Sequence, residues 1–340
     1  MTVTCLDWIL ATVPGLVTTH GDEPAPADAD QRGPGGQPTQ GSSARGTVVL
    51  PSHSRWLRDR VQQKGNPLLL PGVPNALTAR VIESVGFEAV YVSGAGMTNA
   101  YLGAPDVGLL TLSELTAHVA AIRDAIGLPI VVDADTGFGN ALNVQRTVRA
   151  LERAGANAIQ IEDQVAPKRC GHFDGTSVID VAEMVGKVHA AVDARSDPEL
   201  LIIARTDARA ELGIDESCDR ARRYLEAGAD VAFVEAPRTL SEMAAIPRDV
   251  PGCHLINMVE GGLTPILPLG DLGELGYAII LYANTIMRAA IPAMQKAAAV
   301  LYKQGSSLSL LEDIATWEDR QAFVRKAEFD RLGDHYGSFT

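Results

Sequence analysis

Two stretches decide how the rest of the chain is interpreted: PIVVDADTGFG, residues 129–139, and IQIEDQVAPKRCGHF, residues 159–173. Each begins as a short β-branched run and ends in acidic residues, which is typical of a buried strand that delivers carboxylates to a site. Asp133, Asp135, Glu162 and Asp163 are therefore expected at neighbouring strand ends. Because uncompensated negative charge at buried strand ends is costly, this pattern predicts a divalent cation beside them.

Outward from these stretches, short apolar runs alternate with helical patterns. The runs that predict strands cover residues 68–71, 89–93, 130–133, 158–162, 201–205, 231–235, 254–257 and 278–282. Helices are expected over residues 75–85, 113–126, 141–154, 181–194, 215–227, 240–246, 269–275 and 284–303. Eight strands, each followed by a helix, predict an α/β protein with a (β/α)8 TIM barrel. A doubly wound sheet is the alternative, but Gly94 and Gly96 lack the third glycine and the downstream acid of a dinucleotide fingerprint.

The two ends of the chain differ from this repeating part. Residues 21–45 are rich in Pro, Gly and polar residues, so residues 1–50 are expected to be a disordered leader before a catalytic barrel over residues 51–310. Residues 316–336 have the pattern of one amphipathic helix that carries Trp317, Phe323, Phe329 and Leu332. Residues 311–340 are therefore predicted to be a helical oligomerisation segment, with packing under its own barrel as the alternative.

Composition limits the class of partner and the compartment. The net charge is −13 and no block of like charges occurs, so neither nucleic acid nor a membrane surface is expected as a partner. The apolar run of residues 8–17 follows no Lys or Arg and contains Pro14, so it is a poor signal peptide and too short to span a membrane. The four cysteines are scattered without a CxxC pair, which favours a reducing, cytoplasmic location.

Polar residues at the carboxyl ends of barrel strands are typical of a catalytic site. Here they are Tyr91, Ser93, Gly94, Asp133, Asp135, Glu162, Arg205, Asp207, Glu235 and Asn257. Asp133, Asp135 and Glu162 offer hard oxygen ligands for Mg²⁺. Arg205 would add a second cation against the same substrate oxygen, although a plain ion pair with Asp207 or Glu235 is the alternative. The backbone amides of Ser93 and Gly94 suit a substrate carboxylate.

Cys170 is the distinctive residue of the second stretch. It follows Lys168 and Arg169 and precedes Gly171 and His172, and nearby positive charge stabilises a thiolate. Cys170 is therefore a candidate acid or base, carried on a loop whose glycines suggest a lid. Asp106 lies on the loop after the second strand, where it would contact metal-bound water or simply form a turn.

At this point the sequence resembles the isocitrate lyase/phosphoenolpyruvate mutase superfamily. The matching pieces, in the order of that family, are YVSGAG (91–96), LGAPDVG (102–108), VDADTGFG (132–139), IEDQVAPKRCGH (161–172), IIARTDA (202–208), FVEA (233–236) and NMVEGGLTP (257–265). KRCGH is the signature of the lyase branch. The resemblance implies a barrel that depends on Mg²⁺, or Mn²⁺, and forms a homotetramer of dimers that exchange their last helices.

The resemblance also implies a role for each matching residue. The acids that hold the metal are Asp133, Asp135 and Glu162, and Asp106 and Glu235 support the metal and the lid. The carboxylate clamp is formed by Ser93, Gly94 and Arg205, and the second carboxylate site by Gly171, His172 and Asn257. The reacting centre contains Tyr91, Cys170 and Lys168. Cys170 matches the acid that protonates the departing enolate.

The resemblance is nearest to the 2-methylisocitrate lyase, 2,3-dimethylmalate lyase and carboxyphosphonoenolpyruvate mutase group. It implies a carbon–carbon lyase that cleaves a methylisocitrate-like or alkylmalate-like 2-hydroxy acid to an α-keto acid, such as pyruvate, and a second carboxylate. The alternatives are a phosphonomutase or an oxaloacetate hydrolase or decarboxylase on the same frame, and a non-catalytic barrel that binds a metabolite.

Overall fold

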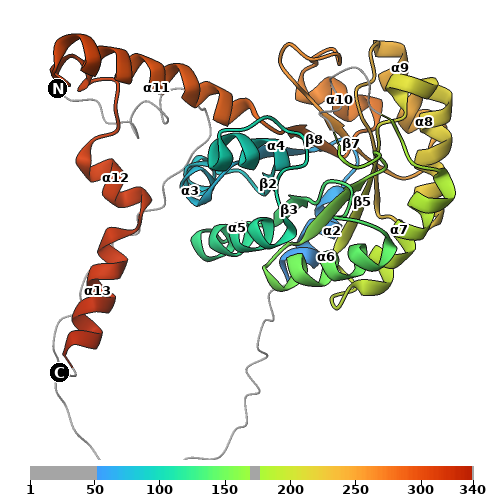
Figure 1. Ribbon diagram of the computed structural model, residues 1–340, viewed down its shortest axis with the longest axis horizontal. Coiled ribbons are helices and arrows are strands. Elements are labelled where there is room, and N and C mark those ends of the chain that lie inside the picture. The colour runs from blue at the N-terminus through green and yellow to red at the C-terminus, as the bar shows by residue number, and fades with distance from the viewer. Residues whose placement is uncertain (1–51, 169–176, 339–340) are drawn as a thin grey trace, which may run out of the picture. The chain divides into compact units, whose positions relative to one another are not determined.

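The chain folds into a closed barrel of parallel strands in a computed structural model that describes residues 52–168 and 177–338 (Figure 1). The strands follow the chain order: β1 Leu68–Val73, β2 Val90–Val92, β3 Ile130–Asp133, β4 Ala158–Glu162, β5 Leu201–Thr206, β6 Val231–Val234, β7 Cys253–Asn257 and β8 Ile279–Tyr282. β8 pairs with β1 in parallel and closes the barrel. The predicted (β/α)8 TIM barrel is confirmed.

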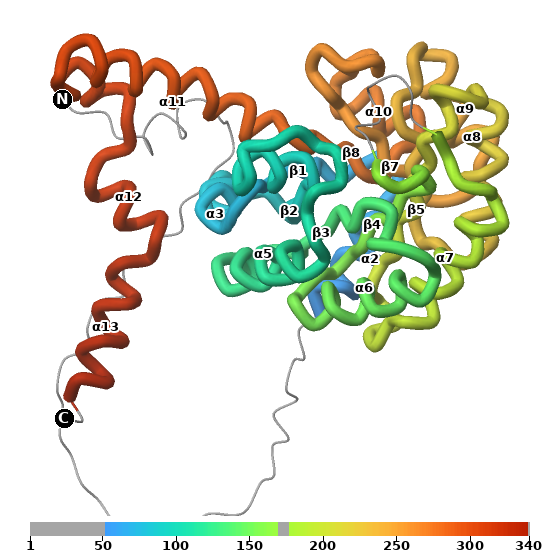
Figure 2. The backbone as a smooth tube through the Cα atoms, viewed as in Figure 1, coloured from blue at the N-terminus to red at the C-terminus, as the bar shows by residue number. Residues whose placement is uncertain are grey.

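A helix follows each strand, and in Figure 2 the helices up to α10 lie around the barrel whereas α11, after β8, extends away from it. They are α3 Ala76–Val85, α5 Leu112–Ala125, α6 Ala141–Arg153, α7 Val181–Ala194, α8 Arg209–Glu226, α9 Leu240–Asp249, α10 Leu269–Leu275 and α11 Thr285–Gln304. Four of them begin where a side-chain oxygen of Asn75, Thr111, Asn140 or Thr239 accepts a hydrogen bond from the backbone N–H three residues later. These caps satisfy amides that a helix start leaves without an intrahelical partner.

The core has an inner and an outer layer. Inside the barrel, alternate residues of the strands, such as Leu70, Ile203 and Phe233, meet and are fully buried. Leu57 of α2 (His53–Val61) joins this inner cluster, so α2 packs against the barrel interior. The outer layer fills the space between the strands and the surrounding helices, for example at Val132 and Val148.

Three local elements differ from the sequence-based prediction. A short helix α4 (Gly94–Met97) and a π-helical turn η1 (Thr98–Leu102) follow β2, where no helix was expected. Helix α8 begins at Arg209 instead of residue 215, and Gly213 with φ 85° kinks it. The single helix predicted for residues 316–336 is wrong, because Arg325 adopts the left-handed conformation (φ 54°) and divides it into α12 (Trp317–Phe323) and α13 (Lys326–Gly337).

Several predictions fall outside the described residues. The leader of residues 1–50, the final residues 339–340, and Cys170, Gly171 and His172 within residues 169–176 all lie there. The domain boundaries at residues 50 and 310 stay predictions. Within residues 52–168 and 177–338, no helix combines the length and the apolar character that a membrane crossing requires.

Candidate active site

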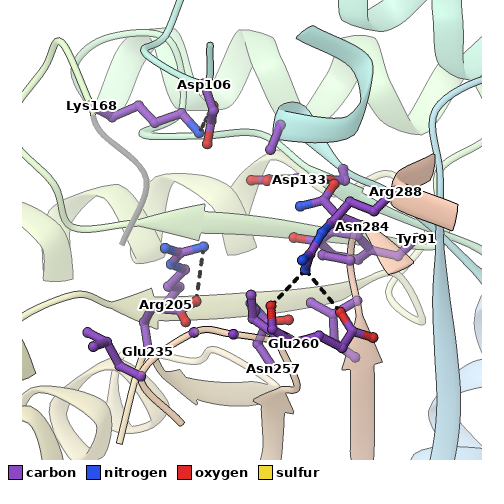
Figure 3. A pocket seen from close by; sticks show the side chains of 18 residues that line it. Tyr91, Asp106, Asp133, Lys168, Arg205, Glu235, Asn257, Glu260, Asn284 and Arg288 are labelled. Atoms are coloured by element: carbon purple, nitrogen blue, oxygen red, sulfur yellow. Dashed lines mark hydrogen bonds and ion pairs between the residues drawn. The ribbon is translucent and has the colours of Figure 1, made fainter. Parts of the chain in front are cut away.

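A cavity of about 320 Å³ opens at the carboxyl ends of the strands (Figure 3). Its lining includes Tyr91, Ser93, Ala95, Asp106, Asp133, Lys168, Arg205, Glu235, Asn257, Val259, Glu260, Leu263, Leu281, Ala283, Asn284 and Arg288. Eight of the residues predicted from strand ends and their loops thus line one cavity: Tyr91, Ser93, Asp106, Asp133, Lys168, Arg205, Glu235 and Asn257. This end of the barrel is where TIM-barrel enzymes carry their active sites.

Gly94 lets the two aspartates after β3 come close to the start of α4. A Cβ atom on Gly94 would lie 3.0 Å from Asp135 Oδ1 and 3.3 Å from Asp133 Oδ2, so both carboxylates contact this position. The Gly94 N–H donates to Asp133 Oδ2 over 3.3 Å, and the Asp135 N–H donates to Asp133 Oδ1 over 3.2 Å. Asp133 therefore joins the loop after β2 to the loop after β3, and the Gly94 amide already has this carboxylate as its acceptor.

Lys168 lies between two carboxylates. Its buried ammonium is 2.6 Å from Asp106 Oδ1 and 2.8 Å from Asp135 Oδ1. Burial raises the pKa of Asp135 to about 6, with Lys168 acting in the opposite direction. Burial alone lowers the pKa of Lys168, but the acids around it raise it above its usual value, so the ammonium stays charged. Lys168 thus ties the loop after β2 to the loop after β3.

Arg205, at the end of β5, is surrounded by acids. Its Nε and Nη2 atoms donate to Asp207 over 2.9 and 2.8 Å. Nε also lies 3.4 Å from Glu162 Oε2, and Nη1 lies 3.3 Å from Glu235 Oε2. The guanidinium also lies 5.2 Å from the centre of the Phe233 ring. The ion pair that the sequence offered as the alternative is present with both Asp207 and Glu235. Arg205 also lines the cavity, and its role as a cation against a substrate oxygen stays a prediction.

Two buried oxygens of the site have neither a hydrogen-bond nor an ion-pair partner among the described residues: Oε1 of Glu162 and Oδ1 of Asn257. Burial is the main cause that raises the pKa of Glu162 well above its usual range. A buried acceptor without a partner is costly, which marks a place where a ligand or an ion completes the bonding.

The charge balance of the site fits a divalent cation. Among the described residues, six carboxylates of the cluster (Asp106, Asp133, Asp135, Glu162, Asp207 and Glu235) stand against two cations, Lys168 and Arg205. No three His, Cys, Asp or Glu side chains in the described part of the chain stand ready as a complete metal cage. Mg²⁺ usually keeps several waters and takes few carboxylates directly, so this donor set suits it.

Asp163 does not belong to the site, contrary to the sequence-based expectation. Successive residues of a strand point to opposite faces, so Asp163 turns away from the side that Glu162 faces. Its carboxylate accepts hydrogen bonds from the side chains of Thr206, Arg220 and Tyr224 and from the Asp207 N–H. Asp163 is fully buried and fastens β4 to β5 and α8.

Sequence reasoning missed further residues at the site. Arg288, in the first turns of α11, donates to the Glu260 carbonyl oxygen over 2.8 Å and lies 3.2 Å from Glu260 Oε2. Thr285 donates to Glu260 Oε1 over 2.6 Å. Gln160 was missed because it lies within the apolar run of β4. Thr285 and Arg288 could have been found from the sequence, because the first turn of the helix that follows the eighth strand must lie at the active-site end of the barrel.

Comparison with known proteins adds a family model and close relatives. The family model described as phosphoenolpyruvate phosphomutase matches residues 57–302. The chain is 47% identical over 252 residues to 2,3-dimethylmalate lyase of Eubacterium barkeri, covering 74% of this chain and 87% of that protein. It is 42% identical over 296 residues to 2-methylisocitrate lyase of Aeropyrum pernix, covering 84% of this chain and 95% of that protein.

Solved structures show the same fold. A crystal structure of 2,3-dimethylmalate lyase, described as a PEP mutase/isocitrate lyase superfamily member, superposes with a TM-score of 0.80 at 33% identity, covering 85% of this chain and 97% of that chain. Oxaloacetate acetylhydrolase with 3,3-difluorooxalacetate gives 0.79 at 29% identity, covering 84% and 97%. Phosphonopyruvate hydrolase with oxalate and Mg²⁺ gives 0.76 at 29% identity, covering 84% and 99%.

Proposed function

Because this chain belongs to the PEP mutase/isocitrate lyase superfamily of enzymes, we propose that it is a magnesium-dependent carbon–carbon lyase. Its substrate is a 2-hydroxy di- or tricarboxylate of the alkylmalate or methylisocitrate kind, which it cleaves to an α-keto acid, such as pyruvate, and a second carboxylate. The observation that carries this proposal is the 47% identity to a 2,3-dimethylmalate lyase across 74% of the chain.

The cavity supports a small, multiply charged substrate with an alkyl group. Arg205 provides a fixed positive charge for a carboxylate, and Asn257 and Ser93 provide polar groups in the lining of the same cavity. Apolar side chains complete the lining, namely Ala95, Val259, Leu263, Leu281 and Ala283. The cavity therefore combines many convergent polar and charged groups with apolar side chains that can contact an alkyl group.

Asp133, Asp135 and Glu162 would hold the metal ion, together with water. When bound, Mg²⁺ or Mn²⁺ would polarise the substrate oxygens and stabilise the negative charge that develops during cleavage. The chain itself would orient the carboxylate through Arg205. Cys170, in our proposal, delivers the proton to the departing fragment, as the tuned thiol of a cationic loop.

The test is a panel of 2-methylisocitrate, 2,3-dimethylmalate, isocitrate, malate and oxaloacetate with Mg²⁺, followed through keto-acid release. We expect EDTA-sensitive release from at least one hydroxy acid. Arg205→Lys should reduce this turnover at least about 100-fold, because an ammonium cannot form the two parallel hydrogen bonds by which the Arg205 guanidinium is held on the Asp207 carboxylate. Arg209→Lys is the matched control, since Arg209 pairs with Glu242 outside the cavity lining.

The second candidate is C–C hydrolysis of an oxaloacetate-like keto acid, favoured by the similarity to oxaloacetate acetylhydrolase. Loss of oxaloacetate alone in the panel, with release of oxalate and acetate, would establish it, whereas release of pyruvate would indicate a decarboxylase. Phosphorus NMR of the products would reveal a phosphonomutase instead. A folded, metal-bound protein that leaves every hydroxy acid intact would contradict the lyase proposal.

We further propose a cytoplasmic homotetramer whose C-terminal helices pack on a second copy of the chain. None of the described residues of α11, α12 and α13 is buried. Large apolar side chains there are nevertheless exposed, including Tyr302 (93%), Trp317 (66%) and Phe329 (63%). Exposed large apolar side chains gathered on the C-terminal helices in this way mark a protein–protein interface.

A further inference from the structure

Gln160 joins two residues that line the cavity, although it does not line the cavity itself. It lies in β4, fully buried, and its Cα pairs with that of Asp133 in the parallel ladder. The Tyr91 hydroxyl donates to Gln160 Oε1 over 3.0 Å, and Gln160 Nε2 donates to Asp133 Oδ1 over 3.2 Å. The Gln160 side chain therefore links Tyr91 of β2 to Asp133 at the end of β3.

The direction of these hydrogen bonds follows from the chemistry of the three groups. A carboxylate only accepts, and both oxygens of Asp133 already accept backbone N–H groups, so the amide must turn its NH₂ toward Asp133. The amide carbonyl oxygen then faces Tyr91, and a carbonyl oxygen also only accepts. The Tyr91 hydroxyl must therefore donate its single proton to the hydrogen bond with Gln160.

The lone pairs of the Tyr91 oxygen can still accept a hydrogen bond, and Tyr91 lines the cavity. A substrate hydroxyl can donate to this oxygen, whereas a keto oxygen or a hydrogen atom in its place cannot. We propose that Gln160 is a positioning residue that makes Tyr91 a hydrogen-bond acceptor for the 2-hydroxyl of the substrate. This inference rests on the proposed function and deepens it, because it explains preference for 2-hydroxy acids at this site.

It follows that Tyr91 orients the hydroxyl and does not take its proton, since a phenol that keeps its own proton cannot hold a second one. The proton must go to another group of the site. A site built to bond a substrate hydroxyl rejects an analogue that lacks it, because the buried polar group is left without its partner.

The experiment compares lactate with propionate, its deoxy counterpart; neither carries a bond that retro-aldol cleavage can break. Dissociation constants are measured by NMR titration at saturating Mg²⁺ in the wild type, Tyr91→Phe, Gln160→Met and the double variant. The metal also contributes to the wild-type preference, so the informative quantity is the change in the propionate-to-lactate ratio. One hydrogen bond of about 1 kcal/mol corresponds to roughly fivefold in this ratio.

We expect Tyr91→Phe to lower the ratio about fivefold. Gln160→Met keeps the Tyr91 oxygen but frees its proton to turn toward the cavity, so this variant should lower the ratio by less. The double variant should lower the ratio no further than Tyr91→Phe alone, because Gln160 acts through Tyr91. Gln160→Glu keeps an acceptor oxygen toward Tyr91 and should retain the preference within twofold. Tyr277→Phe is the control for loss of a buried phenol hydroxyl, since Tyr277 donates to the Met243 carbonyl oxygen away from the cavity, and it should leave the ratio unchanged.

An unchanged ratio in folded Tyr91→Phe would overturn the inference even if the Gln160 variants failed to fold. Additive losses in the double variant would also overturn it, because they would assign Gln160 an effect of its own. The cleavage panel on the wild type tests the proposed function separately: a protein that cleaves hydroxy acids while Tyr91→Phe keeps the ratio retains the function and loses this inference.

Discussion

Cys170 carries the most specific chemical role in the proposed reaction, and its replacement tests that role at the scale of one atom. Cys170→Ser should bind Mg²⁺ and pyruvate as the wild type does but lose at least about 100-fold in turnover, because a serine hydroxyl is a far weaker acid than a tuned thiol. Cys218→Ser is the control, since Cys218 is buried in a cluster between α8 and β6, and it should turn over normally. Turnover near that of the wild type in Cys170→Ser would contradict the role.

Gly72, in β1, has no room for a side chain, because the backbone of Ala283 approaches it closely. A Cβ atom there would lie 1.8 Å from the carbonyl oxygen of Ala283, a distance that no rotamer change relieves. Gly72→Ala should therefore shift Ala283 and Asn284 at the cavity wall, and lower both stability and activity. Gly186→Ala, inside α7 with nothing within 4 Å, should instead add about 0.5–1 kcal/mol to the free energy of unfolding.

Denaturant unfolding of the two alanine variants, side by side, measures this difference. Equal stability of the Gly72 and Gly186 variants would show that the contact at Ala283 relaxes without cost.

At this scale the sequence predicts position better than pairing. Asp133 and Glu162 could be placed at the carboxyl ends of β3 and β4, because each is the acid that follows a β-branched run. The pairing of Lys168 with Asp106 and Asp135 could not be predicted, because it joins loops that are distant in sequence. Asp163 was misplaced because the run IEDQ alone does not say which of two adjacent acids lies beside Arg205 at the site.

At the scale of elements, α2 packs against the amino-terminal part of the barrel interior. Leu57 is fully buried in the inner cluster, with strand residues such as Leu68 and Val231. Leu57→Ala should lower the free energy of unfolding by about 2–5 kcal/mol, because it leaves a cavity where α2 packs against the strands. Urea unfolding provides the measurement, and Leu77→Ala, at a leucine that is 52% exposed, should change stability by less than about 0.5 kcal/mol.

A loss as small as that of Leu77→Ala would mean that α2 does not close the barrel core. Activity should change little in the folded Leu57 variant, because Leu57 does not line the active-site cavity.

Strands and helices of the barrel were predictable because their hydrophobic periods repeat with glycine turns between them. The exceptions depend on single backbone conformations that composition does not reveal. Arg325 divides the C-terminal helix by a left-handed conformation that a non-glycine residue rarely adopts. The α4–η1 segment after β2 is likewise unmarked by any apolar period.

At the scale of the whole molecule, the exposed apolar face of the C-terminal helices should determine assembly. The double variant Trp317→Asp/Phe329→Asp should release smaller species in size-exclusion chromatography with light scattering, because it places charges in the proposed interface. Leu142→Asp, at a leucine of α6 that is 76% exposed, is the control and should leave the mass unchanged. An unchanged mass in the double variant would place the interface elsewhere.

The surplus of acids over cations at the strand ends has a consequence for folding as well as for chemistry. An ion that binds only the native state adds RT ln(1 + [ion]/Kd) to stability, about 2.7 kcal/mol at 100 times Kd. EDTA should therefore lower the melting temperature of the wild type. Glu162→Gln removes one buried charge, so its metal-free form should melt higher than the wild type without metal, while its response to Mg²⁺ shrinks. The free magnesium level of its surroundings would then set how long this protein persists, and not only how fast it works.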